Sequence, residues 1–171
     1  MSNEEMMLEL LEKTFFCENE YHGATDAEIE AAGTQLIARL SNNDLCVPPI
    51  PKDYAAFLKL TDGYAWNGVT FFSTKPMPMD ARYTNPSLYD KNEYYLRMKS
   101  GLNGCLVIGS FDDDIFVYSS MTGKYHCLDE LTLIPSDDDY FDSFSELFVC
   151  VVGELYDCCY GYEDEMTDEE D

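Results

Sequence analysis

Basic residues are scarce in this sequence. The 171 residues include 10 Lys and Arg against 34 Asp and Glu, which gives a formal net charge of -24. A nucleic-acid site uses Lys and Arg to displace counterions from the phosphate backbone, and an anionic membrane surface repels a negative protein. The charge balance therefore argues against nucleic acids and membrane surfaces as partners.

The usual signatures of catalysis and metal binding are also missing. The chain has two histidines, and its seven cysteines form no Cys-x-x-Cys pair that would indicate a zinc knuckle or a thioredoxin motif. His126 and Cys127 are neighbours in a predicted strand, so they point to opposite faces and cannot form a nucleophilic pair. Gly-rich phosphate loops and a Gly-x-Ser-x-Gly elbow are absent. We therefore expect no catalytic residues, no cofactor and no metal ligands.

Long hydrophobic runs are absent too. The longest apolar run near the C-terminus, Leu147 to Val152, falls far below the ~20 residues of a membrane-spanning helix. The acidic N-terminus lacks the positive region of a signal peptide. Seven cysteines cannot all pair within one chain, and no signal peptide is expected. Reduced thiols in a cytoplasm are the simplest interpretation, so we expect a cytoplasmic protein. Cys105, Cys127 and Cys150 have apolar neighbours and are predicted as small core residues.

Aromatic residues, in contrast, are abundant. The chain carries 13 Tyr, 10 Phe and one Trp, which distinguishes it from acidic disordered proteins. A chain of this length buries about 70% of its unfolded surface, enough for a core without disulfides or metals. We predict a single domain over residues 1–162 and an acidic tail over residues 163–171.

Periodicity and capping pairs predict helices at both ends of the domain and strands between them. The expected helices follow Ser2-x-x-Glu5 and Thr25-x-x-Glu28, the second covering about 26–41, and then cover 51–62, 87–99 and 143–156. The expected strands cover 68–73, 105–110, 114–119, 124–129 and 131–134. This order predicts an α+β fold, in which an antiparallel or mixed sheet of about five to six strands packs against N-terminal and C-terminal helices. The helical N-terminal part would cover 3–62 and the β-rich part 65–135.

The negative charge is concentrated toward the C-terminus. Sixteen acidic residues follow Lys124, the last basic residue. The run at 163–171 is interpreted as a solvated tail that aids solubility, with electrostatic binding of a basic protein as the alternative. Two triplets, Asp112-Asp113-Asp114 and Asp137-Asp138-Asp139, lack the alternating ligands and terminal glutamate of a calcium loop. We interpret them as turn carboxylates.

One short aromatic segment lies between turn glycines. Tyr64 and Trp66 precede Asn67-Gly68, and Tyr and Trp are favoured as anchors of protein interfaces. The alternative is that Trp66 is a core residue packed on the third helix.

Three segments resemble the SUKH superfamily, also known as Smi/Knr-like proteins. From Ile50 to Gly63 the chain reads Ile-Pro-x-x-Tyr-x-x-Phe-Leu-x-x-Thr-Asp-Gly, which is similar to the family signature in spacing and residue type. The stretch from Val107 to Tyr118 resembles the family's strand, glycine, acidic turn and strand, and 141–148 resembles the start of its closing helix. The run from Gly63 to Val69 is similar to the YrhA-like branch.

The resemblance implies a SUKH-like fold without common catalytic residues. Bacterial members are mostly immunity proteins that bind and neutralise polymorphic toxins, often nucleases. The implied partner is therefore a cognate toxin, and the acidity of this chain predicts that the toxin is basic. The residues chosen as candidate partner contacts are Tyr64, Trp66, Asp112, Asp113, Asp114, Asp137, Asp138 and Asp139.

Two alternatives remain open from the sequence. The first is an intracellular regulatory scaffold, similar to the eukaryotic relatives that regulate cell-wall synthesis. The second is a cysteine-dependent or metal-dependent hydrolase, which would need an exposed thiol of low pKa or a bound ion.

Overall fold

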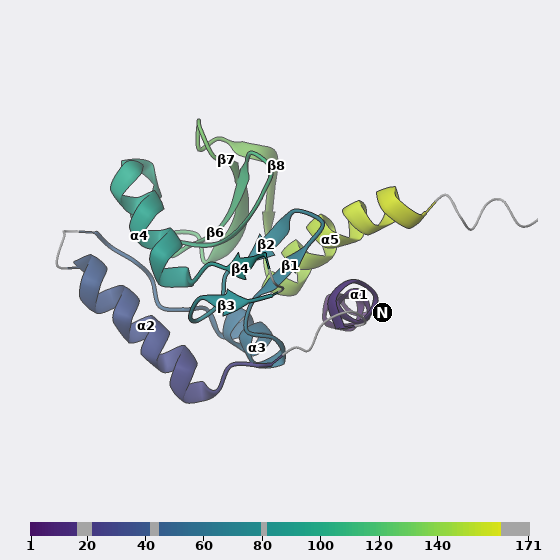
Figure 1. Ribbon diagram of the computed structural model, residues 1–171. Coiled ribbons are helices and arrows are strands. Elements are labelled where there is room, and N and C mark those ends of the chain that lie inside the picture. Colours follow the sequence, from purple (N-terminus) through teal and green to yellow (C-terminus); the bar gives the residue numbers. More distant parts are fainter. Residues whose placement is uncertain (17–21, 42–44, 80–81, 162–171) are drawn as a thin grey trace, which may run out of the picture.

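The computed structural model describes residues 1–16, 22–41, 45–79 and 82–161, with backbone alone at 16 and 136–139 (Figure 1). The helices are α1 (Asn3–Leu11), α2 (Asp26–Ser41), α3 (Lys52–Leu60), α4 (Leu88–Met98) and α5 (Phe144–Tyr160), with a π-helical turn η1 (Glu12–Phe16) and a 3-10 turn η2 (Ser100–Leu102). The strands are β1 (Tyr64–Trp66), β2 (Val69–Phe71), β3 (Met77–Pro78), β4 (Thr84–Asn85), β5 (Cys105–Phe111), β6 (Asp114–Ser119), β7 (Lys124–Asp129) and β8 (Pro135–Phe141). The predicted tail at 163–171 lies outside the described residues.

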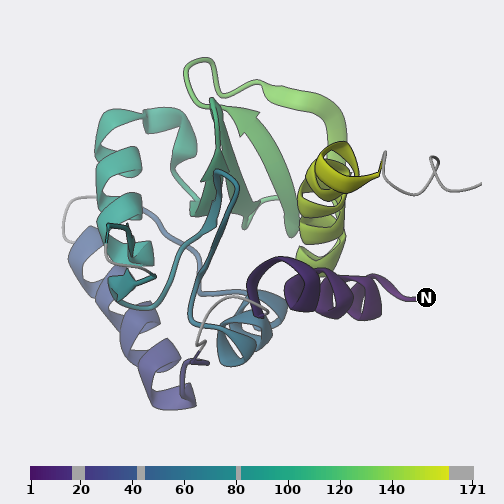
Figure 2. The same ribbon diagram turned by 45° about the vertical axis from the view of Figure 1, so that its right-hand side comes forward.

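The α+β prediction is confirmed. A six-stranded sheet has the order β1-β2-β5-β6-β7-β8, and all its strand pairs are antiparallel. The strands β3 and β4 form a separate small sheet. The helix α5 lies on one side of the large sheet and α4 on the other (Figure 2).

Two of the three predicted capping boxes form; in the third, at Ser143, the Glu146 carboxylate accepts the backbone N–H of Asp142 instead of that of Ser143. The Ser2 hydroxyl accepts the backbone N–H of Glu5 at 3.2 Å, and the Glu5 carboxylate accepts the N–H of Ser2 at 2.7 Å. Thr25 and Glu28 make the same reciprocal pair at the start of α2. Each pair satisfies backbone donors that a helix start leaves without an intrahelical partner. These local bonds explain why the helix starts could be predicted from sequence.

Aromatic side chains form the centre of the core. Phe57 of α3, Phe71 of β2, and Phe144 and Phe148 of α5 are at most 1% exposed. Their ring centroids lie 4.7 to 6.1 Å apart, in tilted, edge and stacked contacts. Burial of one such ring contributes about 1.5–3 kcal/mol. This cluster holds α3 and α5 against the sheet.

The predicted strand at 131–134 is wrong. The Asp129 carboxylate accepts the backbone N–H groups of Leu131 and Thr132 at 3.0 and 2.8 Å, which folds this segment into a turn. The strand β8 begins at Pro135 instead and extends to Phe141. A proline is tolerated there because the first residue of an edge strand need not donate a ladder hydrogen bond. The β-rich part therefore ends at 141, not 135.

Three connections meet at one end of the large sheet, because antiparallel strands reverse alternately at its two ends. They are Asn67–Gly68 between β1 and β2, Asp112–Asp113 between β5 and β6, and Glu130–Ile134 between β7 and β8. We call this the turn end. The C-terminal half of α5 returns to it, since Leu155 and Cys158 line a hollow together with Phe111.

No helix among the described residues is both long and apolar enough to cross a membrane. The three cysteines predicted as core residues, Cys105, Cys127 and Cys150, are half-buried. Cys105 and Cys127 pack against the core.

Candidate partner-binding surface

The turn end brings together candidate residues that are distant in sequence. Trp66 is the last residue of β1, and Asp112 and Asp113 form the turn after β5. A Cβ placed on Gly68 would lie 3.5 Å from the ring of Phe111, so the two hairpins touch. This contact follows from the pairing of β2 with β5. Trp66 and the first acidic triplet therefore belong to the same end of the molecule.

Backbone conformation fixes both turns. Asn67 and Gly68 have φ angles of 49° and 90°, and positive φ at both central residues is typical of a tight hairpin turn. Asp112 has φ of 50°, a value that Asp tolerates better than most residues. The carbonyl of Asp113 accepts the backbone N–H of Glu130 at 2.8 Å, which connects this turn to the next loop. The two carboxylates thus project from a backbone with defined geometry.

The surface at the turn end is strongly negative. The side chains of Asp112 and Asp113 are exposed, and neither forms an ion pair with a Lys or Arg of the described chain. The helix α5 adds Glu154 and Asp157, both exposed. Two lysines offset part of this charge: Lys99 donates to the carbonyl of Glu130, and the ammonium of Lys13 lies 5.7 Å from the centre of the Tyr156 ring. Such a surface attracts cations and basic proteins.

A row of aromatic side chains borders the acidic turns. The Trp66 ring lies 6.3 Å from the ring of Tyr156, which lies 4.9 Å from that of Tyr160. Tyr160 is 49% exposed. The side-chain amide of Asn67 donates to the Cys159 sulfur at 3.2 Å and holds the β1–β2 turn on α5. Aromatic faces beside carboxylates suit the binding of Arg and Lys side chains.

Trp66 is neither a fully exposed interface anchor nor a core residue packed on the third helix. It is half-buried and packs against the core, but its ring neighbour is Tyr156 of α5 and not a residue of α3. Part of the indole therefore stays available at the surface.

Tyr64 is not on the surface, so its selection as a contact residue was wrong. It is 0% exposed, and its hydroxyl shares a hydrogen bond of 2.9 Å with that of Thr14. Its ring lies 5.3 Å from Phe15 and 5.2 Å from Phe148. Burial raises the pKa of this phenol, which keeps it neutral. The first residue of β1 is therefore enclosed by η1 and α5.

The acidic triplets are only partly turn residues. Asp112 and Asp113 form a turn as expected, whereas Asp114 is the first residue of β6 and is half-buried. The backbone of Asp137, Asp138 and Asp139 lies in strand β8, so the turn interpretation is wrong for this triplet. The strand begins four residues later than predicted because Asp129 organises the preceding turn. The side chains of the second triplet lie outside what is described.

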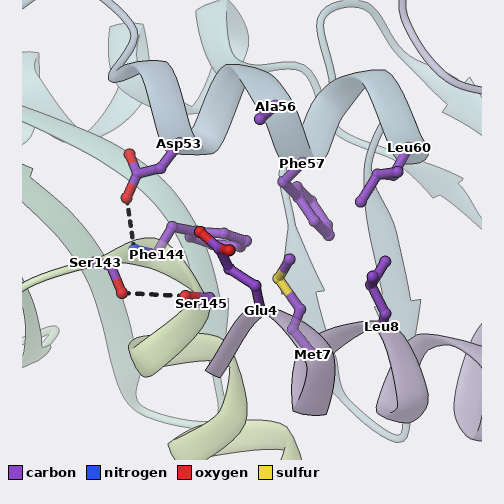
Figure 3. A pocket seen from close by; sticks show the side chains of 10 residues that line it. All are labelled: Glu4, Met7, Leu8, Asp53, Ala56, Phe57, Leu60, Ser143, Phe144 and Ser145. Atoms are coloured by element: carbon purple, nitrogen blue, oxygen red, sulfur yellow. Dashed lines mark hydrogen bonds between the residues drawn. The ribbon is translucent and has the colours of Figure 1, made fainter. Parts of the chain in front are cut away.

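A second hollow lies between α1, α3 and the start of α5 (Figure 3). Its volume is about 290 Å³ and its walls are mainly apolar, with Leu8 and Leu60 on opposite sides. These two leucines are 42% and 39% exposed. Glu4 and Asp53 supply its carboxylates, but Asp53 already accepts the backbone N–H of Phe144 at 2.7 Å. The groove can hold an apolar side chain. Because this groove depends on how separate helices pack, local sequence patterns do not predict it.

Histidine and cysteine side chains of the described residues do not gather into a metal-binding cluster. No three His, Cys, Asp or Glu side chains of the described chain lie close enough together to hold a metal ion. The imidazole of His126 shares a hydrogen bond of 3.0 Å with the Thr122 hydroxyl, and burial lowers its pKa. Burial raises the pKa of the Cys105 thiol, which disfavours the reactive thiolate.

Neither the protein-family models nor the curated proteins searched contain a match to this chain.

Proposed function

We propose that this protein is a non-enzymatic, cytoplasmic immunity protein of the SUKH type that binds and neutralises a basic toxin domain. The observation that carries the proposal is the meeting of Asp112, Asp113 and Trp66 at the turn end, beside the exposed Tyr160. The resemblance of the segments at 50–63, 107–118 and 141–148 to that superfamily supplies the class of function.

Electrostatic complementarity explains how such a protein would recognise its target. A nuclease domain holds Lys and Arg where the phosphates of its substrate bind. The carboxylates of Asp112 and Asp113 can occupy those positions and block access. Opposite fields also speed association, which matters for a protein that must intercept a toxin before it acts.

The aromatic row supplies the short-range part of the interaction. Trp and Tyr dominate the energetics of many interfaces because they bury a large area with little loss of side-chain entropy. Trp66 and Tyr160 border the acidic turns. Charge would therefore govern the rate of association, and the aromatic contacts would govern the lifetime of the complex.

The experiment tests candidate toxin domains encoded by the genes on either side of this one. Each candidate is purified, its binding is measured by calorimetry, and protection is measured in cells that express it. We expect a stable complex and protection by the wild-type protein. Asp113→Lys should weaken binding at least tenfold and reduce protection. Glu30→Lys is the matched control, because it makes the same charge change at an exposed position of α2, which lies away from α5 in both views (Figures 1 and 2).

Two outcomes would contradict the proposal. The first is that the wild-type protein gives neither a complex nor protection. The second is that Asp113→Lys and Glu30→Lys weaken binding equally, which would mean that net charge matters and the turn end does not.

A further inference from the structure

A cleft opens between the C-terminal half of α5 and the face of the sheet, separate from the groove of Figure 3. Its volume is about 300 Å³, small for a cofactor site and suited to a single side chain. It is lined by Phe111, Asp114, Phe116, Cys127, Phe141, Cys150, Val151, Glu154, Leu155 and Cys158. We call it the α5 cleft.

The cleft exists because the side chains of α5 become smaller toward its C-terminus. In the first half of the helix, the large side chains of Phe144 and Phe148 are buried and at most 1% exposed. In the second half, the residues that face the sheet include Val151 and Cys158. On the sheet, Phe116 pairs directly with the smaller Cys127, and both line the cleft.

The charges at the cleft have one sign. Asp114 of β6 and Glu154 of α5 lie on opposite walls, and no basic residue lines the cleft. Glu154 accepts a weak hydrogen bond from the Cys150 thiol at 3.7 Å. Because a thiol is neutral, this contact does not cancel the negative charge of Glu154. Asp114 directly follows the exposed Asp112 and Asp113, so the cleft is continuous with the acidic turn. An anionic ligand would be repelled here.

We propose that the α5 cleft receives one arginine side chain of the basic partner; this inference rests on the proposed function. The methylene groups of an arginine would lie against Phe111 and Leu155, while the guanidinium meets the carboxylate of Glu154 at the rim. The planar guanidinium forms paired hydrogen bonds with a carboxylate. It is also less strongly hydrated than the ammonium of lysine, so its transfer into a partly apolar cleft costs less. An apolar side chain would cover the carboxylate of Glu154 without offering it a hydrogen bond.

A small-molecule probe tests the cleft without the partner. We choose n-butylguanidinium, with n-butylammonium as the comparison, and follow backbone amide chemical shifts of the full chain. The guanidinium compound should shift amides at 111–116 and 150–158 saturably, and it should bind at least threefold more tightly than the ammonium compound. Glu154→Gln should weaken this binding at least threefold. Asp157→Asn, an equal charge change at an exposed α5 residue that does not line the cleft, should leave it unchanged.

Several results would overturn the inference. They are the absence of shifts at the cleft, equal binding of the two cations, and equal effects of Glu154→Gln and Asp157→Asn. The partner experiment separates this inference from the proposed function. If Asp113→Lys abolishes binding of the toxin domain and Glu154→Gln does not affect it, the cleft inference fails and the proposed function stands. If butylguanidinium occupies the cleft while the toxin domain does not bind, the proposed function fails.

Discussion

The carboxylate of Asp53 accepts a hydrogen bond from the hydroxyl of Tyr125 at 2.5 Å. Its second oxygen accepts the backbone N–H of Phe144 at 2.7 Å. One side chain of α3 thus connects β7 to the first turn of α5. Burial raises the pKa of the Tyr125 phenol, so the hydroxyl keeps its proton and remains a donor to the carboxylate.

Asp53→Ala should therefore destabilise the fold. Each hydrogen bond to a charged group contributes roughly 1.5–3 kcal/mol, and the substitution removes two of them. We expect the free energy of unfolding, measured by urea denaturation, to fall by about 3 kcal/mol. The exposed Glu30→Ala should change it by less than about 0.5 kcal/mol. Equal effects of the two substitutions would show that Asp53 does not connect these elements.

Asn92 makes a comparable connection on the other side of the sheet. Its side chain accepts the backbone N–H of Val107 at 2.8 Å and donates to the Val107 carbonyl at 2.8 Å, and all these groups are buried. Asn92→Leu has a similar volume but leaves two buried backbone groups without these partners. We expect a loss of about 2–3 kcal/mol in thermal or urea unfolding. A loss below about 0.5 kcal/mol would contradict this role for Asn92.

Glu28 should contribute to stability in a pH-dependent way. The ion pair with Lys75, assisted by the backbone N–H of Thr25, lowers the pKa of Glu28 from 4.5 to about 2. A carboxyl group with a lowered pKa in the folded state stabilises it above the unfolded pKa, and this contribution is lost as the pH falls through the folded value. Glu28→Gln should therefore be less stable than the wild type at pH 6. The difference should shrink between pH 4.5 and 2, and a difference independent of pH would contradict the assignment.

Tyr64 and Trp66 should behave differently although only Ala65 separates them. Trp66→Ala should weaken binding of the toxin domain at least tenfold, because it removes a half-buried ring at the turn end. Tyr64→Phe should leave binding unchanged and lower stability by about 1 kcal/mol, because the Thr14 hydroxyl loses its buried partner. Calorimetric binding and urea unfolding of both variants test this. Weaker binding by Tyr64→Phe would contradict the buried position assigned to Tyr64.

Features that depend on a few neighbouring residues could be predicted from the sequence. The pairs Ser2 with Glu5 and Thr25 with Glu28 mark helix starts because their bonds are local. The strands β5, β6 and β7 were predicted within one residue, since short turns separate alternating segments. The strand at 131–134 failed because the Asp129 side chain captures the next N–H groups, which periodicity does not reveal.

The candidate surface was predictable only in part. Asp112, Asp113 and Trp66 were chosen for residue type, but their meeting depends on the pairing of β2 with β5. The position of Glu154 at the α5 cleft could not be predicted from the sequence, because the cleft depends on how α5 packs on the sheet. The burial of Tyr64 could not be predicted because it depends on contacts with η1 and α5, which are distant in sequence.

Amide hydrogen exchange of the protein, alone and with the basic toxin domain, tests the central claim most directly. Exchange should slow at Asn67–Gly68, at Asp112–Asp113 and over 154–160, and should stay unchanged along α2 (Asp26–Ser41). Protection confined to α2, or to the groove beside Leu8 and Leu60, would contradict the assignment of the turn end as the binding surface.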